Sequence, residues 1–380
     1  MKLLHRHIFA NVALTSLAAV AVLTFIVALG SVLKDLLAPV LTGQLPLDTF
    51  VQLIGLTVLY SICYTLPAGI LTGVLLVLGR MSADREITAI RAAGVSVAGI
   101  SAPIFFFALL CTGTSLAVNF YYMPEAKVTY EKKFAEAVRS NPLNFLVPKT
   151  FIRNFPNKIV FVGENKNLRL KDVWVWELDN QSRAKEMYHA ERAEISFDEP
   201  TNSLLLTGHN VTVESRNSSD PEDFQNGPKG FGHFEVFSRT LSLEKMTGVP
   251  THKVKTDWLT YNQLMAEVQR LKRPDPKISL AERDRQRIRV QTVIQEKTSK
   301  AFSVLSFALI AIPLGIKVSR KETSANLGIA VILAMAYFIS TVGVKSLDNL
   351  PQLRPDLLMW LPNLWLQALG VWMFYKADRS

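Results

Sequence analysis

The chain has 380 residues, of which 49% are apolar and 19% charged, and its formal net charge is +10. This composition indicates a membrane protein with a substantial soluble part. The charge does not indicate nucleic-acid binding, because residues 123–299 hold 28 basic and 24 acidic residues and no recognition motif.

Six apolar runs are long enough, at about 20 residues each, to cross a bilayer. They fall at residues 8–33, 51–78, 97–122, 301–316, 327–344 and 357–375. The first follows a basic leader, but it is far longer than the apolar core of a signal peptide. We therefore expect it to be retained as the first span.

Lysine and arginine are unevenly distributed over the short loops between these runs. Ten of them lie in the N-terminal leader, in the loops after the second and fourth runs, and in the tail. The opposite loops contain only Lys34, Lys345 and Arg354. Because positively charged loops stay in the cytoplasm, we predict that both termini are cytoplasmic and that the central segment lies outside.

The long segment between the third and fourth runs has a pattern of its own. We divide the chain into spans one to three (residues 1–122), an external domain (residues 123–299) and spans four to six (residues 300–380). The run EAKVTYEKKFAEAVRS predicts a helix that continues span three outward. Alternating stretches then predict short strands of a β-sandwich, including a hairpin with its turn at residues 198–203. Helical periodicity returns with a charged helix that leads directly into span four.

The sequence has no constellation typical of an enzyme. It lacks the GxxxxGK[ST] phosphate loop, and it lacks the HExxH and CxxC metal motifs. Cys63 and Cys111 fall inside predicted spans, where we expect them to act as small packing residues. We predict no catalytic residue, metal site or cofactor in this chain.

A short charged segment, GRMSADREITAIRAAGVS, separates spans two and three. Ser82 is suited to cap a helix and Gly94 to end it, which predicts a helix of about 11 residues within residues 82–94. Two interpretations remain open. The helix lies on the bilayer surface, or it docks in a groove of a cytoplasmic partner with Ile87 and Ile90 as anchors and Glu86 fixing its orientation.

Three stretches resemble the lipopolysaccharide export permease family (LptF/LptG, YjgP/YjgQ). LGRMSADREITAIRAAGVS resembles the cytoplasmic helix of the family, FALIAIPLGIKVSR its fourth span, and WLPNLWLQALGVW its last span. The resemblance covers nearly the whole chain. It implies an α+β membrane protein of the bacterial inner membrane, with six transmembrane helices and a β-jelly-roll-like periplasmic domain inserted between the third and the fourth.

The resemblance also implies a function and a set of partners. The chain would be a non-catalytic permease subunit of an ABC transporter that extracts lipopolysaccharide from the inner membrane and passes it to a periplasmic bridge toward the outer membrane. Its partners would be a paralogous LptF/LptG permease, an LptB-type cytoplasmic ATPase dimer that holds ATP and magnesium, and an LptC-type single-span protein. An envelope scaffold or mechanotransmission protein without lipid transport is the alternative. The shared motifs do not separate the two paralogues.

The residues that this resemblance assigns to coupling and to substrate are the following. The coupling helix would use Asp84, Arg85, Glu86, Ile87, Ile90 and Arg91. The family places basic residues that contact substrate phosphates where Lys34 ends span one, although a lysine that snorkels from the end of a span also accounts for this position. The other basic candidates are Lys345 at the end of span five and Lys127, Lys132 and Lys133 beyond span three. Trp174, Trp176, Phe234 and Val236 either line a lipid groove or are ordinary half-buried strand residues.

Glycine and proline occur within two of the predicted spans. Span two contains Pro67, Gly69 and Gly73, and span four contains Pro313 and Gly315. Such residues permit either bending of a span or close packing between helices.

Overall fold

The structure, a computed structural model, describes residues 2–41, 45–140, 148–153, 155, 157–166, 169–179, 181–198, 203–216, 230–242, 255–273, 279–317, 323–349 and 351–379. The chain divides into two compact units. The helical unit comprises Met1–Ser31, Gly55–Lys127 and Lys255–Ser380, and the second unit comprises Val32–Ile54 and Val128–Val254.

Within the described residues, six helices are long and apolar enough to cross a membrane, as the sequence predicts. They extend over Lys2–Leu36, Leu47–Ala83, Val97–Phe134, Glu282–Lys317, Gly328–Lys345 and Pro355–Lys376. Three candidate spans therefore precede the strand-containing segment in the chain and three follow it.

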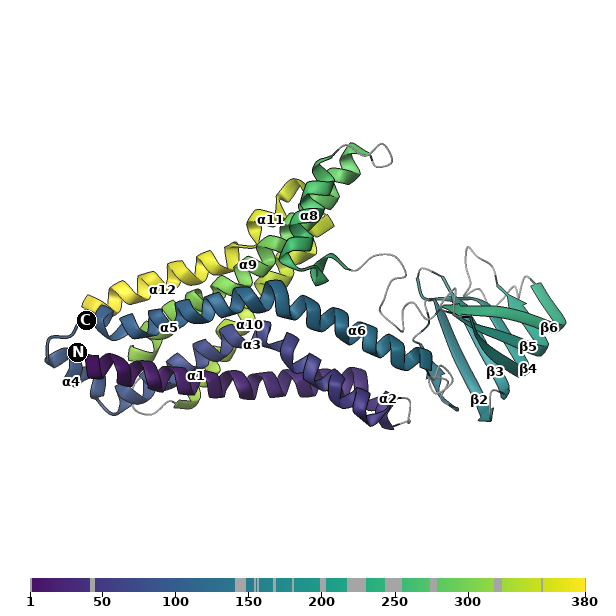
Figure 1. Ribbon diagram of the computed structural model, residues 1–380, viewed down its shortest axis with the longest axis horizontal. Helices are drawn as coiled ribbons and strands as arrows, with labels where there is room; N and C mark the ends of the chain where they lie inside the picture. The colour runs from purple at the N-terminus through teal and green to yellow at the C-terminus, as the bar shows by residue number, and fades with distance from the viewer. Residues whose placement is uncertain are drawn as a thin grey trace. The chain divides into compact units, whose positions relative to one another are not determined.

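The helices divide these spans further (Figure 1). They are α1 (Lys2–Ser31), α2 (Leu37–Leu41), α3 (Leu47–Ala83), α4 (Glu86–Ala92), α5 (Val97–Ala117), α6 (Met123–Ser140), α8 (Tyr261–Lys272), α9 (Leu280–Lys317), α10 (Thr323–Lys345), α11 (Pro355–Leu358) and α12 (Leu361–Arg379). π-helical turns at Val32–Leu36 and Val118–Tyr122 follow α1 and α5. Short 3-10 turns lie at Thr256–Trp258, Ser346–Asn349 and Pro351–Leu353. The helix predicted to continue span three is confirmed as α6, and the charged helix before span four as the first part of α9.

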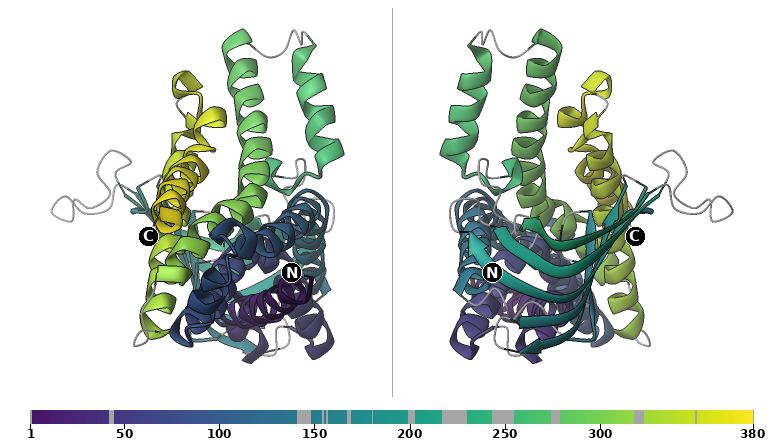
Figure 2. Two further views of the ribbon diagram at one scale, coloured as in Figure 1. Left: turned by 90° about the vertical axis from the view of Figure 1, so that its left-hand side faces the viewer. Right: turned by 90° about the vertical axis from the view of Figure 1, so that its right-hand side faces the viewer.

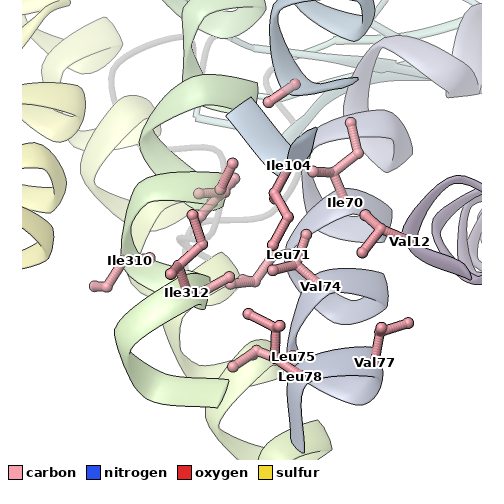
Figure 3. Close-up of a cluster of buried hydrophobic side chains, with 14 of the residues drawn as sticks. Val12, Ile70, Leu71, Val74, Leu75, Val77, Leu78, Ile104, Ile310 and Ile312 are labelled. Atoms are coloured by element: carbon pink, nitrogen blue, oxygen red, sulfur yellow. The ribbon is translucent and has the colours of Figure 1, made fainter. Parts of the chain in front are cut away.

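The apolar core of the helical unit brings α3, α5 and α9 together (Figure 3). Leu71 and Leu75 of α3, Ile104 of α5, and Ile310 and Ile312 of α9 are all fully or almost fully buried. Lipid tails are as apolar as these side chains, so close packing rather than exclusion of water has to hold the helices together.

Small residues let α1 approach α3 closely. A Cβ atom added at Gly73 would lie 2.4 Å from the Cα of Ser16, and one at Gly69 would lie 2.9 Å from the Cα of Val20. The hydroxyls of Thr24 and Thr65 lie 2.6 Å apart in the same interface. Gly69 and Gly73 thus serve close packing, one of the two roles that the sequence allows.

We predict that Gly73→Ala destabilises the helical unit by about 1–3 kcal/mol, because the new methyl group would meet backbone atoms of α1 that cannot move aside. The measurement is thermal unfolding of the full chain in detergent. Gly113→Ala on α5 is the matched control, since nothing lies within 4 Å of its added Cβ. Equal unfolding temperatures for the two variants would contradict the packing role.

The second unit contains one antiparallel sheet (Figure 2). Its strands are β1 (Phe151–Ile152), β2 (Lys158–Lys166), β3 (Arg169–Leu178), β4 (Ala184–Asp198), β5 (Ser203–Ser215) and β6 (Gly230–Ser242). Each strand pairs with its neighbours in sequence, in the order β1-β2-β3-β4-β5-β6. Asp198 pairs with Ser203, which confirms the predicted hairpin. The described strands form a single meander without the two stacked sheets of a jelly roll, so they do not establish that predicted arrangement.

Candidate functional site

α4 is shorter than the sequence predicts. α3 continues to Ala83, and Arg85 adopts a left-handed φ of 60° that separates the two helices. Ser82 does not cap α4, because its hydroxyl donates to the carbonyl of Ile316 at 2.8 Å. α4 therefore has seven residues in place of about 11. Gly94, with a φ of 85°, has the left-handed conformation expected just beyond a helix end.

The apolar stripe of α4 faces the core of the helical unit itself. Ile87 is 4% exposed and belongs to that core, and Ile90 packs against it. The outward side is charged, since Asp84, Arg85 and Glu86 are exposed, whereas Arg91 is half-buried. A binding partner would therefore meet the charges and not the two isoleucines that the sequence suggests as anchors. α4 lies at the same end of the helical unit as the first turn of α1 and the last turn of α12 (Figure 1).

A cavity of about 160 Å³ opens among the ends of four spans in the helical unit. Successive spans run in opposite directions, so the first halves of spans two and four lie on the same side as the ends of spans three and five. The cavity is lined from these places by Tyr60, Tyr64, Met123, Lys127, Val293, Glu296, Lys297, Lys300 and Lys345, together with Asp257 and Trp258.

Glu296 lies at the centre of the charges that line the cavity. Its Oε1 accepts a hydrogen bond from Nζ of Lys300 at 2.6 Å, and its Oε2 lies 3.0 Å from Nζ of Lys345. The side chains of Glu296 and Lys300 are only 7% and 11% exposed. Lys345 also pairs with Asp257 at 3.0 Å, and Nζ of Lys300 lies 4.7 Å from the centre of the Tyr64 ring. A buried carboxylate that has both oxygens paired avoids much of the desolvation cost of an isolated charge.

Lys297 and Lys127 are positioned by other groups. Lys297 donates to the carbonyl of Leu259 at 2.8 Å. Nζ of Lys127 lies 5.3 Å from the centre of the Tyr60 ring and 5.7 Å from that of Trp258. An aromatic ring attracts an ammonium group without neutralising it. The cavity lining contains four lysines and two carboxylates, which gives it a surplus of two positive charges.

The sequence identified two of the four lysines, Lys127 and Lys345. It did not single out Glu296, Lys297 and Lys300, because they lie in a segment whose pattern is that of a charged helix leading to the membrane. Their position directly before the fourth apolar run is the feature of the sequence that could have identified them. Charged side chains at that depth are costly unless they are paired or functional.

The other predicted lysines belong to the second unit. Lys34 is exposed in the π-helical turn after α1, Lys132 is exposed on α6, and Lys133 on α6 is half-buried. None of the three is among the described residues that line the cavity.

One face of the sheet is apolar, and strand register identifies its members. Val173 of β3 pairs with Ala190 of β4, which pairs with Val211 of β5, and Val211 pairs with Phe234 of β6. Val173, Ala190 and Val211 are buried, and Phe234 is 44% exposed. Phe234 thus lies on the apolar face.

The two tryptophans lie on the opposite face. Trp174 alternates with the buried Val173 and Val175, as the sequence predicts, and its ring centre lies 5.9 Å from that of Trp176. Val236 pairs with His209 and lies on this second face as well. Three of the four strand residues suggested for a lipid groove are therefore absent from the apolar face.

The alternation of faces is interrupted at one level of the sheet, where Asp172 of β3 and Asn210 of β5 adopt left-handed φ angles of 53° and 58°. Phe234 and Val236 lie on opposite faces across this level although they are two residues apart. The apolar residues on either side of this level are three apart in the sequence. They are Leu170 and Val173, Ala190 and Ala193, Gly208 and Val211, and Phe234 and Phe237.

A polar network interrupts the apolar face. Nη2 of Arg239 lies 3.3 Å from Glu177 and 3.2 Å from Glu186, and it also donates to the hydroxyl of Tyr188. Burial, and then the hydrogen bond to Glu186, raise the pKa of Tyr188 to about 12. Burial lowers the pKa of Arg239, but its contacts with Tyr188 and the two carboxylates outweigh this and raise the pKa above its ordinary value. Arg239 therefore stays charged at neutral pH.

Cys63 and Cys111 are free thiols within spans. In the described part of the chain, no group of three or more His, Cys, Asp or Glu side chains is placed to hold a metal ion.

Six candidate membrane spans, four of which line a basic cavity, with an antiparallel sheet inserted in the chain after the third, define a multi-pass membrane protein. The family model described as lipopolysaccharide export system permease LptF/LptG matches residues 6–376. The chain belongs to this family, which confirms the predicted resemblance.

Curated relatives agree with the family match. The chain is 20% identical over 352 residues to the lipopolysaccharide export system permease protein LptF of Escherichia coli (strain K12) and to that of Shigella flexneri. The alignment covers 89% of this chain and 86% of each relative.

We predict that Lys300→Met destabilises the helical unit by about 3–5 kcal/mol, because it leaves the buried Glu296 short of one cationic partner. The double variant Glu296→Leu with Lys300→Met should recover much of this loss, since it removes both charges together. Thermal unfolding of the full chain in detergent compares the two. A double variant less stable than the single one would contradict mutual compensation of these charges.

Proposed function

We propose that this chain is a permease subunit of an ABC transporter that extracts lipopolysaccharide from the inner membrane and passes it to a periplasmic bridge toward the outer membrane. The observation that carries the proposal is the basic cavity at the ends of four spans, in a chain of the LptF/LptG family. A lipid carrying phosphate groups supplies the negative charge that this cavity lacks.

The charge of the cavity matches a phosphate group. A phosphate monoester carries about −1.5 to −2 charges at pH 7, which matches the surplus of two positive charges. Lys127 and Lys345 are the predicted substrate contacts that the cavity contains, and Lys297 and Lys300 join them in this proposal. An envelope scaffold without lipid transport has no use for a cavity lined by four lysines, so we favour transport.

The apolar face of the sheet is suited to acyl chains. Val173, Ala190 and Val211 form the buried apolar layer of this face, and Phe234 extends it with a side chain that is 44% exposed. Covering acyl chains beside Phe234 is worth about 0.8 kcal/mol per buried CH₂. In this proposal the sheet is periplasmic, extends the bridge as an open jelly roll, and receives lipid with the help of an LptC-type protein. Trp174, Trp176 and Val236 point away from that path.

We further propose that α4 and both termini are cytoplasmic. α4 lies at the end of the helical unit where α1 begins and α12 ends, and the loops predicted there are rich in lysine and arginine (Figure 1). α4 would then couple the chain, paired with a paralogous permease, to an LptB-type ATPase dimer that holds ATP and magnesium. The contact would be made by the exposed Asp84, Arg85 and Glu86, with Ile87, Ile90 and Arg91 holding α4 in place from behind.

Purification of the full chain with its native partners tests the whole proposal. We expect an ATPase, a second permease and lipopolysaccharide to copurify with it. Recovery of the chain alone, without an ATPase or glycolipid, would contradict the proposed function.

We predict that Glu86→Lys lowers the amount of copurifying ATPase by about tenfold, because it reverses a charge on the proposed contact surface. Membrane insertion should be unaffected. The control is Asp48→Lys, which reverses an exposed charge at the other end of α3. Undiminished recovery of ATPase with Glu86→Lys would contradict the coupling role of α4.

We predict that Lys345→Gln weakens binding of fluorescent lipopolysaccharide by about tenfold, because one charge-assisted contact to phosphate is lost. Binding is measured with the purified complex in lipid nanodiscs. Arg354→Gln is the control, since Arg354 is a basic side chain paired with Asp356 outside the cavity lining. Equal losses in the two variants would indicate a general effect of surface charge and not a site.

A further inference from the structure

Glu296 is placed where an anionic ligand of the cavity would have to bind. It is the carboxylate that contacts two of the four lysines at once, Lys300 through one oxygen and Lys345 through the other. These two lysines come from different helices, α9 and α10. A carboxylate bridging two cations in this way has the same contacts that a phosphate group would make there.

We propose that Glu296 is a resident counter-anion, which a phosphate group of the incoming glycolipid displaces from Lys300 and Lys345. Glu296 then determines how tightly the head group is held and how readily it leaves. This inference rests on the proposed function and concerns the same cavity.

The larger negative charge of a phosphate group favours its displacing Glu296 from the two lysines. A phosphate group of charge about −2 is attracted to two ammonium groups more strongly than a single carboxylate of charge −1. The ring of Tyr64 holds Lys300 by a cation–π contact, which positions its ammonium group without neutralising it.

Release is favoured by the same carboxylate. Glu296 is nearly buried and cannot leave the cavity lining, so it stays beside the bound phosphate as a like charge and weakens the complex. When the phosphate group leaves, Glu296 pairs again with Lys300 and Lys345. A cavity with four lysines and no such carboxylate would hold a phosphate more tightly and discharge it more slowly, which is unsuitable for a site that must empty in each cycle.

The structure also shows why Glu296, and not Asp257, competes with a bound phosphate group. Asp257 pairs with Lys345 at 3.0 Å, and its side chain is 49% exposed, so water screens its charge. Glu296 is 7% exposed and contacts both lysines. The proposal therefore assigns the competition to Glu296.

The test is Glu296→Gln in the full complex in nanodiscs, because glutamine keeps the size of the side chain and removes its charge. The measured quantities are the affinity and the dissociation rate of fluorescent lipopolysaccharide. We expect binding about tenfold tighter than wild type, with the gain mainly in slower dissociation. Lipopolysaccharide stripped of its phosphates should show no gain.

Glu267→Gln is the matched control. Glu267 also pairs with a basic side chain, Arg270 on α8, but it does not line the cavity. We expect unchanged binding for this variant. A gain equal to that of Glu296→Gln would overturn the proposal, because the effect would then come from overall charge.

A second comparison covers the case in which Glu296→Gln does not fold. The double variant Glu296→Gln with Lys300→Gln removes the pair together and is compared with Lys300→Gln alone. We expect the double variant to bind several-fold tighter than the single one. Equal or weaker binding in the double variant would overturn the proposal.

The outcomes separate this inference from the proposed function. If wild type binds, Lys345→Gln weakens binding and Glu296→Gln does not tighten it, the competition is wrong and the transport function stands. If wild type does not bind lipopolysaccharide, or if Lys345→Gln has no effect, both are overturned.

Discussion

The arrangement of the helical unit depends on one constraint: charged side chains within apolar spans have to find partners. Glu296 satisfies it by joining Lys300 of its own helix to Lys345 of α10. α10 is the least buried of the six spans, so this ion pair and the one to Asp257 are important attachments of its end. The contacts that stabilise the spans are thereby the contacts that a phosphorylated ligand would have to exchange.

Small and polar residues hold the other spans. Gly69 and Gly73 bring α3 against α1, and a Cβ at Gly370 of α12 would lie 3.0 Å from the Cγ of Leu309 on α9. Asn363 of α12 donates to the carbonyl and the hydroxyl of Ser299 at 2.7 and 3.0 Å. Because lipid provides little hydrophobic force between helices, such close contacts and interhelical hydrogen bonds are what a bundle of this kind has available. α9 and α12 are thus joined more firmly than α9 and α10.

The sequence predicted the elements whose cause is local. Apolar runs predicted the six spans, and the alternation of Val173 with Trp174 predicted their opposite faces. The prediction failed where a contact with a distant part of the chain determines the local structure. Ser82 has a side chain suited to cap a helix, but its hydroxyl donates to the carbonyl of Ile316 on α9. Only the folded chain shows this hydrogen bond. The alternation pattern of the sequence likewise does not show its interruption at Asp172 and Asn210, across which Phe234 and Val236 lie on opposite faces.

The candidate site was predictable in part for the same reason. Lys345 stands out because it ends a predicted span, and Lys127 because it is the first basic residue beyond span three. Glu296 and Lys300 are four residues apart, which is the spacing of an ordinary ion pair on a solvated helix. What distinguishes them is burial against α3 and α10, and no pattern within α9 contains that information.

α9 connects the two places to which function is assigned. It contributes Glu296, Lys297 and Lys300 to the cavity, and it continues without a break to Ile316, whose carbonyl accepts from Ser82 just before α4. At 1.5 Å per residue, the 16 residues from Lys300 to Ile316 extend over about 24 Å. A Cβ at Gly315 would lie 2.7 Å from the Cβ of Leu78, so α9 and α3 cannot slide past each other freely there. A movement of α9 at the cavity therefore has to be accommodated at the start of α4, and a force applied to α4 has a continuous helix through which to act on the charges around Glu296.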